Sequence, residues 1–187
     1  MLMLPTLAAC RDNSKVSNSL KNSPTSKAVT APIPPLGTDV SLTITGYNYT
    51  DRYIDQFTVN GNGGGNLFVS GPNSGGGGSA CCMDYITGVK RWKFPVTWQI
   101  GGCTYNTRKY KDGRERSDLY HFFKEVEVQV DPKIASRPAY LELHFYPDGH
   151  VEAAVTENAS LPRLQLSRDR EDKSPYKQCP NDKRPEE

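Results

Sequence analysis

The sequence predicts an all-β domain, an antiparallel sandwich or an open barrel with glycine-rich loops. Several stretches alternate apolar and polar residues with a period of two, which is typical of half-buried strands, whereas no segment has a convincing period of 3.6 residues. The 187 residues also include 16 Gly and 14 Pro, which favour short strands joined by turns.

The alternating stretches give the expected strands in chain order. Apolar and polar residues alternate over 40–45, 96–100 and 125–130, and shorter runs occupy 54–59 and 67–70. The stretch 117–124 could form a helical turn, but Tyr120, Phe122 and Phe123 also suit a strand. We therefore expect the folded domain to span residues 39–166, followed by a polar C-terminal tail over 167–187.

Residues 139–157 predict a hairpin, because Pro147, Asp148 and Gly149 supply the conformations of a tight turn. A three-residue loop would pair Tyr146 with His150. One face of the hairpin then carries three apolar cross-strand pairs, Phe145 with Val151, Leu143 with Ala153 and Leu141 with Val155. The other face carries Glu142, His144, Tyr146, His150 and Glu152, with His144 opposite Glu152.

The charge balance excludes some classes of function. The chain has 23 Lys+Arg and 21 Asp+Glu, a formal net charge of +2, which is too balanced for a dedicated nucleic-acid-binding protein. No apolar stretch approaches the roughly 20 residues that a membrane-spanning helix needs. We expect one domain with tails and no nucleic-acid partner.

The N-terminus resembles a lipoprotein signal. Residues 1–10, MLMLPTLAAC, form an apolar run with small residues directly before Cys10, the pattern at which bacterial lipoproteins are acylated and cleaved. No Lys or Arg precedes the run, so residues 1–9 are expected to be the end of a truncated signal peptide. Arg11 after Cys10 favours sorting to the outer membrane, facing the periplasm. The alternative is a buried or free cysteine after an ordinary apolar N-terminus.

Residues 10–38 are polar and interrupted by prolines, so we expect a disordered tether after the lipidated Cys10. The remaining cysteines, Cys81, Cys82, Cys103 and Cys179, are even in number and allow two disulfides in an oxidising compartment. Cys81 and Cys82 point to opposite sides of an extended chain, so we expect one bridge from each to Cys103 and Cys179, in an order that the sequence leaves open. Zinc binding is the disfavoured alternative, because adjacent cysteines lack the C-x2-C spacing.

The polar hairpin face is the strongest candidate for chemistry. His144, His150 and Glu152, with Glu142, could form a metal site or an acid–base pair of a periplasmic hydrolase. We favour a solvated face with cross-strand charge pairs, because the two histidines are only diagonal neighbours and no nucleophile motif accompanies them. The glycine-rich runs 61–66 and 75–79 lack the context of a phosphate-binding loop and are expected to be flexible turns. We therefore expect no catalytic residue, metal or cofactor.

Basic residues concentrate in one loop. The segment 108–116 contains five basic residues and two acids, and Lys90–Lys93 adds a shorter basic run. A basic loop with aromatic neighbours could meet an acidic protein, lipid headgroups or peptidoglycan; a solvated loop is the alternative.

Four motifs resemble a known family. These are ITGYNYTDRYID at 44–55, VNGNGGGN at 59–66, SGGGGSACC at 74–82 and HFYPDGHVEAAVTE at 144–157. They are similar to a family of uncharacterised proteobacterial lipoproteins with a domain of unknown function, often encoded beside type VI secretion phospholipase effectors and regarded as their immunity proteins. The basic segment 108–116 and Cys179 lie outside these motifs.

The resemblance implies an immunity protein that binds a phospholipase effector in the periplasm and occludes it. Such a protein needs no chemistry of its own, because an interface of about 800 Å² per partner excludes substrate. Aromatic and arginine anchors dominate such interfaces. Our candidate anchors are Tyr47, Tyr49, Tyr53, Trp92, Arg108, Lys109, Lys111, Arg114 and Arg116. The alternative for the tyrosines and the tryptophan is a place in the core of the sheet, which suits these residue types equally well.

Overall fold

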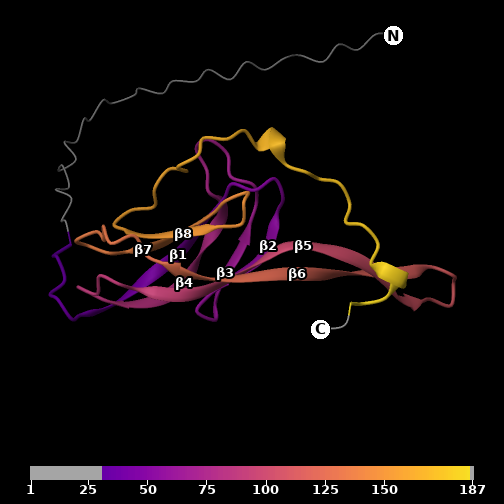
Figure 1. Ribbon diagram of the computed structural model, residues 1–187, viewed down its shortest axis with the longest axis horizontal. Coiled ribbons are helices and arrows are strands. Elements are labelled where there is room, and N and C mark those ends of the chain that lie inside the picture. Colours follow the sequence, from indigo (N-terminus) through magenta and orange to yellow (C-terminus); the bar gives the residue numbers. More distant parts are fainter. Residues whose placement is uncertain (1–30, 186–187) are drawn as a thin grey trace, which may run out of the picture. The chain divides into compact units, whose positions relative to one another are not determined.

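The computed structural model describes residues 31–185, apart from the side chain of Arg108. These residues contain eight strands and two short 3₁₀ turns (Figure 1). Their bounds are β1 (Asp39–Asn48), β2 (Ile54–Val59), β3 (Asn62–Leu67), β4 (Gly76–Ile86), β5 (Lys93–Lys109), β6 (Glu115–Gln129), β7 (Tyr140–Phe145), β8 (Val151–Thr156), η1 (Arg168–Arg170) and η2 (Pro180–Asp182). The predicted signal peptide, Cys10 and most of the predicted tether lie outside the described residues.

The strands form two four-stranded sheets, which confirms the predicted all-β sandwich. One sheet has the order β4-β1-β7-β8 and the other the order β3-β2-β5-β6. Neighbouring strands are antiparallel except β1 and β7, which pair in parallel. The sheets are not closed into a barrel. No helix in the part of the chain described here is both apolar enough and long enough to cross a membrane.

The core lies between the two sheets. Leu42, Leu141 and Phe145 of the first sheet are fully buried, as are Phe57 and Val96 of the second. The Phe57 and Phe145 rings meet across the core at a centroid distance of 5.2 Å. Burial of these alternate side chains is the hydrophobic term that holds the sheets together.

The predicted hairpin and its register are confirmed. Phe145 pairs with Val151, Leu143 with Ala153 and Leu141 with Val155 in β7 and β8. The Tyr146 amide donates to the His150 carbonyl at 3.1 Å, which closes the three-residue loop. The three apolar pairs face the core, so the hairpin's other face is the outer face of the β4-β1-β7-β8 sheet.

Strands β5 and β6 are the longest antiparallel pair. Figure 1 shows their distal parts extending beyond the other strands as a two-stranded ribbon. Residues 117–124 belong to β6, so the strand interpretation of this stretch is confirmed and the helical turn is wrong. A register shift between Gln99 and Gly101 ends the expected alternation, and Ile100 is therefore 56% exposed.

Both flanks of the predicted domain pack onto it. Thr87 at the end of β4 donates to the Pro35 carbonyl at 2.5 Å and accepts the Thr38 amide at 2.9 Å, so residues 31–38 are part of the folded unit. After β8 the chain continues through η1 to η2, which lies beside the distal part of β5 (Figure 1). The predicted polar tail is thus attached to the domain along its described length.

The predicted disulfide pairing is wrong. Cys81 is bonded to Cys82, and Cys103 of β5 is bonded to Cys179. The prediction assumed an extended trans chain at Cys81–Cys82, whereas this peptide bond is cis and the two Cα atoms lie 3.1 Å apart. Cys103 and Cys179 meet because Thr104 forms backbone hydrogen bonds with Lys177 and Cys179, at 2.9 and 2.8 Å.

Candidate functional site

The polar face of the hairpin is covered by the chain that follows β8. Residues 157–172, here called the strap, cross the outer face of the β4-β1-β7-β8 sheet and leave Glu142 and His144 only 1% and 0% exposed. The expectation of a solvated face is therefore wrong for these two residues. Alternation placed them on the correct face, but it could not show that a later segment covers that face.

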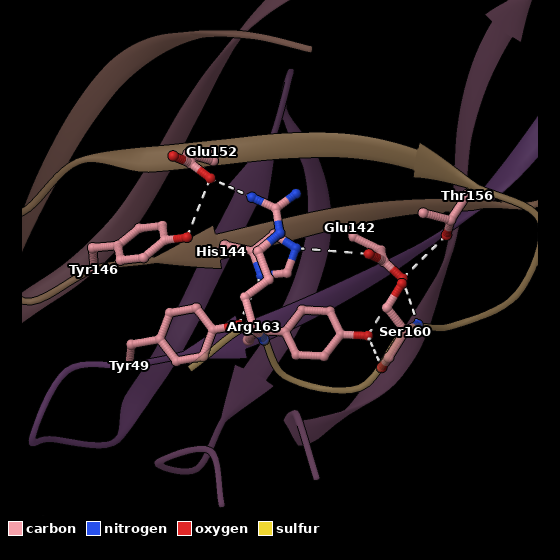
Figure 2. Close-up of polar contacts among 9 residues, drawn as sticks. Tyr49, Glu142, His144, Tyr146, Glu152, Thr156, Ser160 and Arg163 are labelled. Atoms are coloured by element: carbon pink, nitrogen blue, oxygen red, sulfur yellow. Dashed lines mark hydrogen bonds and ion pairs between the residues drawn. The ribbon is translucent and has the colours of Figure 1, made fainter. Parts of the chain in front are cut away.

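Glu142 is the hydrogen-bond acceptor that holds the strap (Figure 2). Its Oε1 accepts the Ser160 amide at 2.7 Å and the Thr156 hydroxyl at 3.1 Å. Tyr47 of β1 adds a longer contact to Oε1 at 3.4 Å and donates to the Ser160 carbonyl at 2.6 Å. Both backbone groups of Ser160 are thus bound by side chains of the sheet.

His144 lies at the centre of the site, between two tyrosines. Its ring stacks on Tyr47 at a centroid distance of 4.5 Å, and its Nδ1 lies 3.0 Å from the Tyr49 hydroxyl. Tyr49 accepts the Arg163 amide at 2.7 Å, which leaves its own proton for His144 Nδ1. His144 Nε2 then carries the ring proton and faces Glu142 Oε2 at 3.6 Å, without a hydrogen-bond partner among the described residues.

Burial sets the protonation of this pair. Desolvation lowers the pKa of His144 below its ordinary value, so the imidazole is neutral at pH 7. Burial opposes ionisation of Glu142 as well, but the nearby His144 ring and the hydrogen bonds from Ser160 and Thr156 outweigh it and lower the pKa of this carboxyl. Burial also raises the pKa of Tyr47, and the negative charge of Glu142 raises it further. A neutral histidine beside an ionised glutamate is consistent with the assigned tautomer.

The rim of the cluster is open to solvent. Glu152 accepts from the guanidinium of Arg163 and from the Tyr146 hydroxyl, the latter at 3.2 Å (Figure 2). His150 stacks on Tyr146 at 4.1 Å, and its Nε2 lies 3.8 Å from Glu152 Oε1. These partners are half-exposed side chains, so they add less to stability than the covered contacts of Glu142.

The arrangement is suited to fastening the strap. His144 is enclosed, whereas His150 and Glu152 lie at the surface, so the three residues of the hypothetical hydrolase site do not face one cavity. Within residues 31–185 no group of three or more His, Cys, Asp or Glu side chains is placed to hold a metal ion. The contacts that this cluster makes run from the sheet to Ser160 and Arg163 of the strap.

The aromatic candidates for partner binding divide into two pairs. Tyr47 and Tyr49 are 2% and 1% exposed, so the expectation that they anchor a partner is wrong for the folded state, and they bind the strap instead. Tyr53 is half-buried, with its ring 5.0 Å from that of Phe68. Trp92 is also half-buried and packs between Tyr85 and Phe94 at the edge of the core.

The β5–β6 ribbon carries large apolar side chains at the surface. Its exposed residues are Ile100, Leu119, Phe122 and Phe123, at 56%, 37%, 40% and 48%. Because side chains alternate along β6, Leu119 and Phe123 share one face of the ribbon and Tyr120 and Phe122 the other. An exposed apolar cluster of this kind marks an interaction surface more often than a single exposed residue does.

The tip of the ribbon is the basic segment predicted from the sequence. Lys109 lies 3.6 Å from Glu115, Arg114 pairs with Asp112 at 2.7 Å, and Arg116 pairs with Asp118 at 2.9 Å. Lys111 is exposed, and Arg108 is the β5 residue opposite Arg116 in the ladder. Asp112 and Glu115 are exposed and Asp118 is half-buried, so the pairs are screened by water and the tip keeps excess positive charge.

Fold and site together define a two-sheet β-domain with a covered polar cluster on one side and an aromatic, basic ribbon on the other. The model of the family described as "Protein of unknown function (DUF3304)" matches residues 47–153, more than half of the chain, so the protein belongs to this family. No curated protein and no solved structure matches the chain. The match confirms the predicted membership of a family of unknown function.

Sequence reasoning missed the residues that cover the site. Ser160, Arg163 and Arg170 lie in a segment that was expected to be the end of the domain and a tail. Arg170 donates to the carbonyls of Ser70 and Asn48 at 2.8 and 3.0 Å. No periodic signal marks this segment, and only the parallel register of β1 and β7 brings Tyr47 beside His144.

Proposed function

We propose that this protein is a binding module of the cell envelope that neutralises a phospholipase effector of type VI secretion. It would be held by an acylated Cys10 on the periplasmic face of the outer membrane and would act by occluding the effector. The effector class and the location come from the family resemblance of the sequence motifs.

The observation that carries the binding role is the β5–β6 ribbon. Four large apolar side chains are exposed on it, next to a tip with five basic residues and two acids. Aromatic residues give affinity when they become buried, and excess charge accelerates encounter with an acidic partner. The ribbon is therefore suited to enter an acidic, apolar-lined entrance of a lipase and exclude its substrate.

Two further features support the proposal. The polar cluster of Glu142 and His144 is occupied in holding the strap, whereas the apolar side chains of the ribbon are exposed. The two disulfides support this location, because disulfides persist in oxidising compartments such as the periplasm. Inhibition by occlusion needs a rigid surface of about 800 Å² and no chemical step by the inhibitor.

The test is co-expression of the full chain with a type VI secretion phospholipase effector, taken from the gene next to its own where one is encoded there. We expect the chain to co-purify with the effector and to protect cells from lysis. The triple variant K109E/K111E/R114E should lose at least about tenfold in protection, which equals about 1.4 kcal/mol of binding energy.

The matched control is K90E/R91E, which reverses exposed charges in the other basic run, in the turn between β4 and β5. This variant should protect like the wild type. Equal protection by the tip variant would show that the ribbon does not bind the effector. A wild-type chain that binds anionic phospholipid vesicles but not the effector would contradict the proposed partner.

A further inference from the structure

Strand β6 has a free edge along an unusually apolar stretch. It is the last strand of the β3-β2-β5-β6 sheet, and within the described residues no strand pairs with its other edge. Only Val130, just beyond β6, forms a bridge to Ala153 of β8. A long, exposed edge strand with large apolar side chains is a template for pairing with another strand.

We infer that β6 pairs antiparallel with β6 of a second copy of this chain, about a two-fold axis at His121. The result would be one continuous eight-stranded sheet. A two-fold axis perpendicular to a sheet leaves each face of the sheet on the same side. Two residues that pair across the axis must therefore point to the same face, and because side chains alternate along a strand, the axis lies at a residue and not between two residues.

The sequence of β6 is self-complementary in this register. Leu119 lies opposite Phe123 of the second copy on one face, and Tyr120 lies opposite Phe122 on the other. Asp118 lies opposite Lys124 of the second copy, which gives an ion pair of opposite charges. Each of these pairs occurs twice by symmetry, and aromatic, apolar and opposite-charge cross-strand pairs are the stabilising kinds.

Neighbouring registers lack this complementarity. An axis at Tyr120 would place Arg116 opposite Lys124, a repulsive pair, and Asp118 opposite Phe122. An axis at Phe122 would place Leu119 opposite Glu125 and Asp118 opposite Val126. An axis at His121 also places Glu115 opposite Glu127, a repulsive pair near the ends of the paired stretch, but of these three registers it alone has three favourable pairs around its centre.

The surroundings of Lys124 in the single chain support pairing with a second copy. This half-buried ammonium donates to the Gly149 carbonyl at 2.8 Å and lies 5.6 Å from the centroid of the Trp98 ring. In the described part of the chain, no carboxylate oxygen lies within 4 Å of it. Asp118 of the second copy, whose Oδ1 binds Arg116 of its own chain at 2.9 Å, would supply that charge from its carboxylate.

The faces of the ribbon leave room for this pairing. Leu119 lies over Gly102 of β5, where an added Cβ would be 3.0 Å from the Leu119 Cδ1 atom. The Arg184 guanidinium lies over the Tyr120 ring at 5.6 Å, on the opposite face. Both contacts are with the faces of the ribbon and not with the outer edge of β6, which approaches β8 only toward its C-terminal end.

The first experiment is sedimentation equilibrium of the full chain carrying Cys10→Ser, which prevents acylation. We expect a concentration-dependent dimer. L119D and F123K should each weaken dimerisation by at least about tenfold, because each places a charge opposite an apolar residue. The double variant L119D/F123K should restore it to within about threefold, since two opposite-charge pairs then form.

A chain that stays monomeric up to about 1 mM would overturn the inference, and so would a double variant no better than the single ones. A cross-linking experiment tests the register without depending on affinity changes. With His121→Cys in the C10S chain, oxidation should yield a covalent dimer, because the two cysteines face each other at a distance that a disulfide spans.

The matched control is Ser117→Cys, an exposed position on the same face of β6. In the inferred register it faces Glu125 of the second copy and should not cross-link. Cross-linking at Ser117 but not at His121 would refute the register. These experiments contain no effector, so their outcome is independent of the proposed immunity function.

Discussion

Removing one buried oxygen tests how the strap is fastened. Tyr49→Phe deletes a hydroxyl that accepts the Arg163 amide at 2.7 Å and donates to His144 Nδ1 at 3.0 Å. The phenyl ring keeps the packing, because Tyr49 is 1% exposed and its Oη is the only atom lost. The change therefore isolates the polar contribution of this residue.

The expected loss of stability depends on whether each hydrogen-bond partner of the Tyr49 hydroxyl can bind water instead. His144 is fully buried, so its Nδ1 stays unpaired and costs about 1–3 kcal/mol. Arg163 is exposed and its amide can bind water, so only the net value of that hydrogen bond is lost, about 1 kcal/mol. We expect a total of about 3 kcal/mol, or a fall in Tm of roughly 6–12 °C for a domain of this size.

Urea unfolding followed by circular dichroism measures the loss, and hydrogen exchange of residues 157–166 measures opening of the strap. The matched control is Tyr146→Phe, which removes a 3.2 Å hydrogen bond to the exposed Glu152 and should cost less than about 1 kcal/mol. If Tyr49→Phe destabilises no more than this control, or leaves exchange of the strap unchanged, the hydroxyl does not fasten the strap.

Three further predictions concern pH, packing and the long-range disulfide. Burial lowers the pKa of His144 in the folded chain below its ordinary value of 6.5. As the pH falls, the unfolded chain therefore binds a proton at His144 before the folded chain does. The free energy of unfolding should accordingly decrease as the pH drops below about 6.5. Urea titrations between pH 8 and 5 should show this slope, and His144→Gln should reduce it. Gly64→Ala should lower the free energy of unfolding, measured by thermal unfolding, by about 1–3 kcal/mol, because the new Cβ would lie 2.0 Å from a Phe57 ring carbon. The control Gly63→Ala should lower it little, because no atom lies within 4 Å of the new Cβ. Breaking the Cys103–Cys179 disulfide with Cys179→Ser should lower the free energy of unfolding by about 4 kcal/mol, because it closes a loop between residues 76 apart; a loss below about 1 kcal/mol would contradict this.

The strands could be predicted where alternation and turn chemistry agree. The hairpin of β7 and β8 is correct to the residue, because Pro147, Asp148 and Gly149 fix the loop length and a one-residue slip would bury charges. Alternation fails at Ile100, where a register shift in β5 changes the face that the side chain occupies. Such irregularities depend on the neighbouring strand, which local sequence does not describe.

The candidate site could be predicted only in part, for a related reason. Alternation placed Glu142 and His144 together on one face, but their burial depends on a strap that lies outside any periodic pattern. Tyr47 and Tyr49 were named as candidate anchors because aromatic residues are common in interfaces, with burial as the alternative, and the strap encloses them. The pairing of Cys81 with Cys82 was missed because it depends on a backbone conformation that an extended strand does not have.

The central claim, that the β5–β6 ribbon binds the partner, is tested most directly by hydrogen exchange of the chain alone and in complex with the proposed phospholipase effector. The account predicts that amides of residues 100–123 gain the strongest protection in the complex, while the strap over Glu142 and His144 changes little. Protection confined to the strap or to the β4 edge, with an unchanged ribbon, would contradict it.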